Sequence, residues 1–157
     1  MIYNRDAAVA YAQEWAYKRN PRYYNFDTLG GDCTNFISQC LYAGSGIMNY
    51  KKTFGWYYNS INDRAPAWTG VSYLYNFLIA NKGTGPYAIE LPLDKTQVGD
   101  IIQLSFDGSV YVHSLIVVAV NDGNIYVATH TDDYSSRALN TYIYNKVRLL
   151  HIDGVRG

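Results

Sequence analysis

Residues 30–44 read GGDCTNFISQCLYAG, and the fold expected for the chain depends on how this stretch is interpreted. Two glycines and an acid lead into an apolar stripe of helical period, formed by Cys33, Phe36, Ile37, Cys40 and Leu41. Asp32 is of a residue type that caps helix N-termini, and Gly44 is suited to end a helix. The stretch therefore predicts a helix with Cys33 in its first turn and Cys40 on its buried side.

The pattern on either side of this helix predicts an α+β fold. Apolar residues at helical spacing indicate further helices near residues 7–16 and 67–80, and residues 45–65 are expected to be irregular. From Gly99 the pattern changes to four strand-like segments, GDIIQLSF, VYVHSLIVVAV, IYVATHTDD and YIYNKVRLLHID. Helices that precede an antiparallel sheet are typical of the α+β class.

Length and composition limit the classes of function. The chain has 157 residues, a formal net charge of zero and 17% charged residues, which favours neither nucleic acid nor an anionic membrane surface as partner. The N-terminus lacks the apolar segment of a signal peptide, and no run approaches the ~20 apolar residues of a membrane span. We expect one domain over residues 1–157, monomeric, with no nucleic-acid partner and no membrane insertion.

Two histidines and an acid are expected to share one face of a hairpin. A two-residue turn at Asp122–Gly123 would set His113 opposite Asp132, and period-two alternation puts His130 on the same face. His113 would then be a base with two possible orienting groups, between which the spacing does not decide. A slip of one residue in the register would turn His113 away from both.

A cysteine in the first turn of a helix has two properties that suit a nucleophile. The positive end of the helix dipole favours its thiolate, and the free backbone N–H groups can stabilise an oxyanion. A neighbouring imidazole, such as that of His113, would complete an activated nucleophile.

Structural roles are the alternative for each of these residues. A free cysteine such as Cys33 is often a small core residue, and we expect this role for Cys40. His151, with apolar neighbours, is expected to be a satisfied polar residue. A zinc site could use Cys33, His113, His130 and Asp132, but the chain lacks C-x2-C and HExxH spacings. We therefore expect no metal and no cofactor, and two free thiols.

The stretch at 30–44 resembles the nucleophile segment of the putative amidase domain family of Gram-positive bacteria. That family is related to the NlpC-type and CHAP-type cell-wall hydrolases of the papain-like superfamily. The resemblance continues through YAQEW, AWTGVSYLYNFL, VGD, HSLIVV and HTDD, so that it spans nearly the whole chain. DCTNFISQCL is its most specific part, whereas GD and HS carry little weight alone.

The resemblance implies a papain-like α+β fold and a cysteine amidase or peptidase. It implies Cys33 as the nucleophile, His113 as the base and His130 as the third catalytic residue, with Asp132 as the alternative. The implied substrate is a peptide or peptidoglycan fragment. An acyltransferase, or an inactive module that binds wall or peptide, stays open as an alternative.

Aromatic residues are frequent, with 17 Tyr, 5 Phe and 3 Trp, which suits both a peptide- or sugar-binding cleft and a tyrosine-rich sheet. The residues expected to contact substrate lie before the nucleophile and in the aromatic loops, at Tyr23, Tyr24, Asn25, Asp32, Trp56 and Trp68. The segment that contains Tyr23, Tyr24 and Asn25 is also the expected source of a second oxyanion donor, because it leads into the helix.

Overall fold

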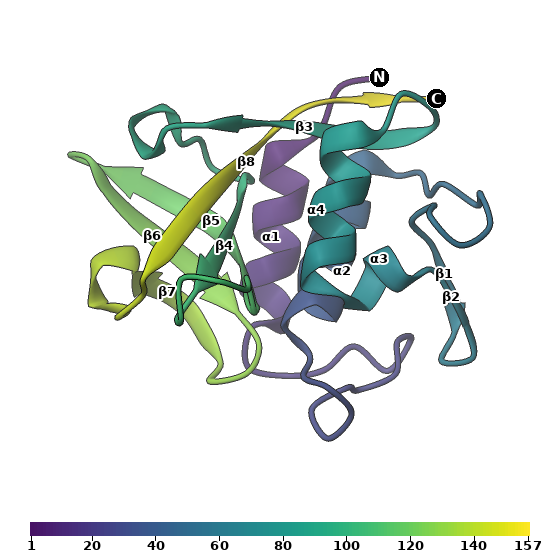
Figure 1. Ribbon diagram of the computed structural model, residues 1–157, viewed down its shortest axis with the longest axis horizontal. Coiled ribbons are helices and arrows are strands. Elements are labelled where there is room, and N and C mark those ends of the chain that lie inside the picture. The colour runs from purple at the N-terminus through teal and green to yellow at the C-terminus, as the bar shows by residue number, and fades with distance from the viewer.

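Helices form one half of the molecule and a sheet the other, in a computed structural model that describes residues 1–157 (Figure 1). The helices are α1 (Arg5–Trp15), α2 (Cys33–Ser45), α3 (Pro66–Thr69) and α4 (Val71–Ala80). Short 3₁₀ turns, η1 (Leu93–Lys95) and η2 (Leu139–Thr141), lie in the second half. The α+β class predicted from the sequence is confirmed.

Two glycines correct the predicted helix ends. Gly44 lies inside α2, where an added Cβ would be 2.9 Å from the carbonyl oxygen of Asn4, and the helix ends instead at Gly46 with a left-handed φ of +71°. The helix predicted near 67–80 is broken at Gly70, whose extended backbone separates α3 from α4.

The main sheet has six antiparallel strands in the order β3-β8-β4-β5-β6-β7. Its strands are β3 (Gly85–Leu91), β4 (Ile101–Ser105), β5 (His113–Asn121), β6 (Asn124–Thr129), β7 (Tyr134–Ala138) and β8 (Lys146–Arg156). The four predicted strands correspond to β4, β5, β6 and β8. The sequence did not predict β3 and β7, nor the separate hairpin of β1 (Tyr58–Ser60) and β2 (Asp63–Arg64).

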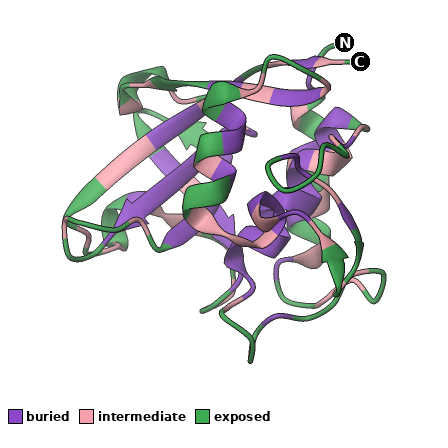
Figure 2. Ribbon diagram, turned by 45° about the vertical axis from the view of Figure 1, so that its right-hand side comes forward, coloured by how far each residue is buried: buried purple, intermediate pink, exposed green.

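Side chains on the two faces of the sheet enter different apolar clusters. Ile101 and Ile116 join the large cluster between the sheet and the helices, whereas Ile102 and Leu115 join a smaller cluster on the opposite face. Buried residues gather where helices and sheet face each other, and exposed residues line the outer loops (Figure 2). No helix has the length and apolar character that a bilayer crossing requires.

A bulge changes the register of the hairpin that carries the candidate site. Next to the turn at Asp122–Gly123 the pairing of β5 with β6 is the predicted one, but it shifts between Val117 and Ala119. Beyond the shift Ile116 pairs with Ala128, one residue away from the predicted register. The predicted pairing of His113 with Asp132 is therefore wrong.

Candidate active site

Cys33 is the first residue of α2 and lies where this helix meets the start of β5. Its side chain is 8% exposed, the backbone N–H of Ser114 donates to its sulfur, and Thr34 Oγ1 is 3.7 Å from the sulfur. The Asp32 side chain makes no capping hydrogen bond to the helix. The N–H groups of the first turn are thus available to an oxyanion beside the sulfur.

Asp32 is fully buried and serves a structural purpose instead of contacting substrate. Its Oδ1 accepts hydrogen bonds from the Phe26 backbone N–H (2.8 Å) and from Asn35 Nδ2 (2.9 Å). Its Oδ2 lies 2.5 Å from His130 Nδ1. The expectations that Asp32 caps the helix with its side chain and contacts substrate are wrong, because both oxygens are occupied inside the protein.

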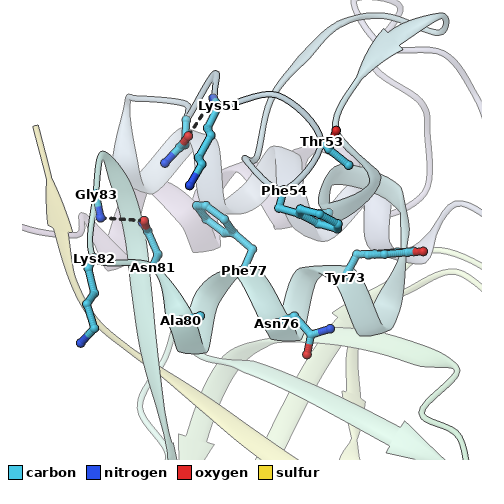
Figure 3. A pocket seen from close by; sticks show the side chains of 12 residues that line it. Lys51, Thr53, Phe54, Tyr73, Asn76, Phe77, Ala80, Asn81, Lys82 and Gly83 are labelled. Atoms are coloured by element: carbon cyan, nitrogen blue, oxygen red, sulfur yellow. Dashed lines mark hydrogen bonds between the residues drawn. The ribbon is translucent and has the colours of Figure 1, made fainter.

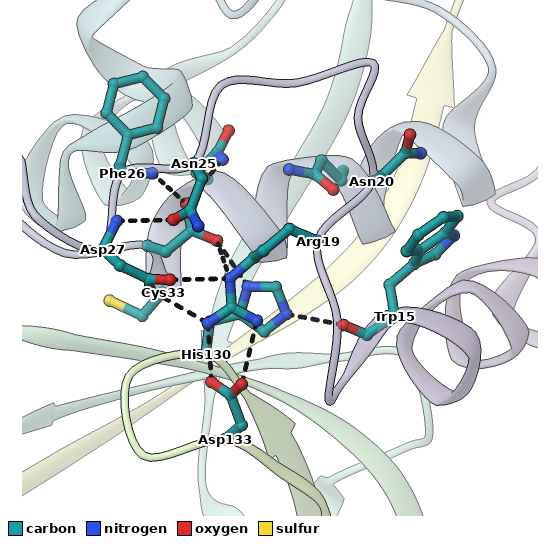
Figure 4. Close-up of polar contacts among 12 residues, drawn as sticks. Trp15, Arg19, Asn20, Asn25, Phe26, Asp27, Cys33, His130 and Asp133 are labelled. Atoms are coloured by element: carbon teal, nitrogen blue, oxygen red, sulfur yellow. Dashed lines mark hydrogen bonds and ion pairs between the residues drawn. The ribbon is translucent and has the colours of Figure 1, made fainter.

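His130 lies against Asp32 and against the end of α1, and Figure 4 shows it beside Trp15. Its Nδ1 bonds Asp32 and its Nε2 lies 2.8 Å from the carbonyl oxygen of Trp15. Both ring nitrogens are thus occupied inside the protein, one by the Asp32 carboxyl group and one by the end of α1. The ring also stacks on Phe36 at 3.9 Å between centroids. The structure thus gives His130 partners other than His113, in contrast to the predicted role as its orienting residue.

Arg19, which the sequence did not single out, joins the segment after α1 to the turn after β6. Its guanidinium donates to Asp27 (3.1 Å) and to Asp133 (3.0 Å), and Nε lies 3.5 Å from Asp32 Oδ2 (Figure 4). Burial opposes the charge, but the hydrogen bonds that Arg19 donates to the two acids outweigh it, so the pKa of Arg19 is raised. The ion pairs hold the 26–32 loop against the sheet.

The first two residues of β5 point to opposite faces of the sheet. Ser114 faces α2, where its Oγ is 3.0 Å from Thr34 Oγ1. The buried ring of His113 lies near Phe106 and Tyr142, with centroids 6.5 and 6.2 Å away. His113 is thus the neighbour in sequence of Ser114, which lies against the Cys33 segment. The His113 ring itself lies on the face of the sheet opposite to α2.

Thr129 fixes the tautomer of His113. Thr129 Oγ1 lies 3.4 Å from His113 Nε2, and 3.0 Å from the carbonyl oxygens of both Ser114 and His130. Its one hydrogen goes to a carbonyl, so toward His113 the hydroxyl oxygen accepts. His113 Nε2 therefore carries the proton and Nδ1 is the basic nitrogen. The bulge explains why the sequence did not reveal Thr129, since the predicted register left it off the His113 face.

Burial keeps both members of the candidate pair neutral. It lowers the pKa of His113 to about 4, with Asp132 opposing the effect and Arg137 adding to it. Burial also raises the pKa of the Cys33 thiol, although the Ser114 N–H and the Thr34 hydroxyl act in the other direction. The favourable effect expected of the helix terminus is therefore outweighed by burial, which acts against the charged form of Cys33.

Asp132 lies in a strained, exposed turn directly after His130. Thr131 and Asp132 both have left-handed backbones, with φ of +67° and +57°. The negative charge of Asp132 is the acidic influence on the pKa of His113, so it acts on the base electrostatically and without a ladder pairing.

The two tryptophans expected to bind substrate are core residues. Trp56 and Trp68 are 0% exposed, and their indole N–H groups donate at 3.0 Å to Ser38 Oγ and Asn35 Oδ1. The prediction that they contact substrate is wrong. Tyr23, which stacks on Trp68 at 5.9 Å between centroids, is only partly exposed.

Tyr24 and Asn25 are the predicted contact residues that face solvent. Tyr24 is 41% exposed, and Asn25 Oδ1 accepts from the Asp27 backbone N–H, which leaves the Asn25 Nδ2 group without a partner in the protein. This amide lies in the loop that leads into α2 (Figure 4). The two residues form the accessible rim of the segment before the nucleophile.

The structural roles predicted for Cys40 and His151 are confirmed. Cys40 is fully buried, which raises the pKa of its thiol, and both cysteines are free. His151 Nδ1 is 3.0 Å from Asp100 Oδ2. No group of three or more His, Cys, Asp or Glu side chains converges as metal ligands would.

A hollow lies apart from the candidate residues, between the loop that follows Asn49 and the outer side of α4 (Figure 3). It has a volume of about 510 Å³, and Phe54, Tyr73 and Phe77 provide its aromatic walls. None of the residues expected to act in catalysis lines it. The site at Cys33 is thus defined by its polar contacts and is separate from this hollow.

A family model described as "Putative amidase domain" matches residues 2–152 of the chain. Two proteins of Bacillus subtilis (strain 168) are similar to it, the uncharacterized protein YhbB, 34% identical over 139 residues, and the uncharacterized protein YjcM, 25% identical over 137 residues. The matched segments cover 86% and 82% of this chain but 43% and 31% of those proteins, so the chain spans less than half of their length. No solved structure matches, and the papain-like relationship stays a prediction.

Proposed function

We propose, for a chain that belongs to the putative amidase domain family, hydrolysis of an amide bond with Cys33 as the nucleophile and His113 as the base. The observation that carries the proposal is the 3.0 Å contact between Thr34 Oγ1, in the residue next to Cys33, and Ser114 Oγ. It brings the start of β5, and with it the residue before Ser114, against the N-terminus of α2. Nucleophilic catalysis requires the base within hydrogen-bond reach of the thiol, so the proposed mechanism has the His113 ring turn from the other face of the sheet toward Cys33 when substrate is bound.

The neutral state of both groups fits a general-base step. His113 Nδ1 takes the proton of Cys33 as the sulfur attacks the carbonyl carbon, and returns it to the leaving amine as the C–N bond breaks. The product is an acyl-enzyme. A water molecule, deprotonated by the same nitrogen, then breaks the C–S bond and releases the acid. We place the proton transfer at the open end of β5, where His113 begins the strand.

Two groups are suited to hold the oxyanion of the tetrahedral intermediate. The backbone N–H of Cys33 is free of a side-chain cap, and it points out of the helix terminus. The Asn25 Nδ2 group has no partner in the protein and lies in the loop that precedes the helix. We assign these as first and second donors, with the exposed Tyr24 beside them as a contact for substrate.

The substrate we propose is a peptide amide of peptidoglycan, in a stem peptide or a cross-bridge. The resemblance to cell-wall hydrolases supports this class, and the tyrosine-containing rim before α2 suits an extended peptide.

Purified sacculi provide the test. The wild-type protein, under reducing conditions, should release new amino termini that mass spectrometry can assign, and Cys33→Ala should release none. Release by Cys33→Ala at the wild-type rate would end the proposed mechanism. Release of no fragment by the wild-type protein, together with cleavage of soluble peptides, would retain the mechanism and reject the wall substrate.

A further inference from the structure

A line of buried polar side chains runs from Cys33 across the sheet. Thr34, Ser114 and Gln103 are each at most 1% exposed, yet every one of them is hydrogen-bonded to the next. The line begins at the Cys33 sulfur and ends at Arg148 of β8. Buried polar groups in such a row require partners, and here they provide them for one another.

The guanidinium of Arg148 fixes the direction of these hydrogen bonds. Arginine has only donors, and its Nε and Nη2 reach Gln103 Oε1 at 2.9 and 2.6 Å. The Gln103 oxygen is thereby identified, so Nε2 must donate, to the Val71 carbonyl oxygen (3.0 Å) and to Ser114 Oγ (3.3 Å). The assignment of the amide follows from chemistry and leaves no flipped alternative.

The two hydroxyl groups of the row are assigned so that they continue the direction set by Gln103. Ser114 Oγ accepts from Gln103, and in this assignment its hydrogen goes to Thr34 Oγ1, at 3.0 Å. The Thr34 hydrogen then goes to the Cys33 sulfur, at 3.7 Å. With this assignment the bonds that link Gln103 to the sulfur all run toward the sulfur.

Arg148 is held in place by two rings. Its guanidinium carbon lies 3.6 Å from the ring centroid of Tyr75 and 3.9 Å from that of Tyr111. Stacking between aromatic faces orients the planar group and leaves its edge for the Gln103 oxygen. The cation is therefore fixed at the far end of the row.

We propose that Arg148 is a positioning residue for the nucleophile, which favours the Cys33 thiolate through a one-way chain of hydrogen bonds. A negative sulfur strengthens the Thr34 bond, and in a chain each bond polarises the next, so the thiolate gains more than the thiol. The inference rests on the proposed role of Cys33 as the nucleophile. It adds a source of stabilisation for the thiolate, whose charge is destabilised by burial.

Other charged groups near Cys33 stay unchanged in the test. Asp32 precedes it on its own segment and is paired with His130 from the end of β6. His113, from the start of β5, is the remaining titratable group. None of these three bonds a member of the chain through its side chain, so substitutions in the chain leave their contacts intact.

The pH dependence of alkylation by iodoacetamide, mapped by mass spectrometry to Cys33, measures the effect in the full chain without any substrate. Thr34→Val removes the hydroxyl next to the sulfur and should raise the thiol pKa by about one. Arg148→Met keeps an apolar stem between the tyrosines and should raise it by about half as much, since its charge acts through three bonds. Thr34→Ser should restore the wild-type value.

Arg156→Met is the matched control, because Arg156 also stacks on a tyrosine, Tyr87 at 3.8 Å, but bonds the Asn81 carbonyl away from Cys33. It should leave the alkylation profile unchanged. Gln103→Glu is the second variant, since its carboxylate still accepts from Arg148 but cannot donate to Ser114. It should raise the thiol pKa by at least as much as Arg148→Met.

Equal profiles for Arg148→Met, Gln103→Glu and Arg156→Met would overturn the proposal, whatever Thr34→Val does. Failure of the proposed function looks different. In that case the profiles shift as expected, while amide hydrolysis is the same with and without the Cys33 thiol.

Discussion

The two cysteines of α2 occupy opposite environments on one helix. Cys40 lies within the apolar stripe and is fully buried in the large apolar cluster. Cys33, at the helix start, touches the Ser114 N–H and the Thr34 hydroxyl and lies beside the Asp32–His130 pair. The two residues are of the same type, so their positions in the helix account for the difference between Cys33, the candidate nucleophile, and Cys40, a packing residue of the core.

The same contrast extends to the surrounding polar residues. Near the N-terminal end of α2, Thr34, Asn35, Ser38 and Asp32 are all buried, and each has a named partner outside its own helix turn. Burying so many polar groups costs desolvation free energy even when each is hydrogen-bonded, which suggests that the network serves to position the Cys33 site. Substitutions at Cys33, at Cys40 and at the residues around the Cys33 site test this contrast.

The largest effect is expected from replacing each of the two cysteines in turn by alanine. Cys33→Ala should lower kcat/KM for amide hydrolysis by at least about a thousandfold, because no other nucleophile replaces the sulfur. Cys40→Ala should leave the rate unchanged and lower the free energy of unfolding by about 1 kcal/mol, through a small cavity. Steady-state kinetics and urea denaturation measure the two quantities. Equal losses of rate in Cys33→Ala and Cys40→Ala would contradict the distinction between a catalytic and a packing cysteine.

The two histidines should separate activity from stability. His113→Ala should lower kcat by about a hundredfold or more while the protein stays folded, because the base is lost. His130→Ala leaves Asp32 buried without its histidine partner and should lower the free energy of unfolding by about 3 kcal/mol. Thermal melts measure the stability of the two variants, and initial rates of hydrolysis measure their activity. A His113 variant that hydrolyses at the wild-type rate would contradict its role as the base.

His113 should also make stability depend on pH. Its pKa is 6.5 when exposed and about 4 in the folded protein, so the unfolded chain takes up a proton first as the pH falls. Stability should therefore decline between pH 6.5 and 4, by about 2–3 kcal/mol in all, and be unaffected by this group above pH 7.

The measurement is the difference between wild type and His113→Gln in urea denaturation across this range, which cancels the other titrating groups. The difference should grow as the pH falls. A constant difference would show that the folded and unfolded pKa values of His113 are equal.

The smallest effect concerns the tautomer of the base. Thr129→Val keeps the shape but removes the acceptor for His113 Nε2–H, and should lower kcat by about tenfold with little change in KM. Thr129→Ser, which retains the oxygen, serves as the control. Parallel losses in the two variants would assign Thr129 to packing alone.

The sequence predicted the class of fold well and the lateral pairing poorly. The helical stripe of α2 and the apolar runs of β4 and β5 are strong local patterns, and they were found. The edge strands β3 and β7 have no such run. β3 is held by pairing with β8, which is distant in sequence, and β7 is held by pairing with β6 across a turn. Their existence depends on tertiary pairing, which local periodicity does not report.

The candidate site was predicted in composition but not in arrangement. The bulge between Val117 and Ala119 sits among small apolar residues that give no signal for it, and it moves His130 and Thr129 by one position. Asp32 occupies the N-cap position that its residue type predicts, but its side chain makes no hydrogen bond to the helix terminus. It bonds His130 instead, a residue 98 positions away, and no spacing rule anticipates that contact.

The most direct test of Cys33 as the nucleophile is to trap the acyl-enzyme. Hydrolysis of sacculi or of soluble peptides is stopped in acid during turnover, and peptides of the protein are analysed by mass spectrometry. We predict an acyl adduct on the peptide that contains Cys33, none on Cys40 when the two sites are resolved by fragmentation, and none in Cys33→Ala. Turnover with the thiol of Cys33 unmodified throughout, or continued in Cys33→Ala, would contradict the account.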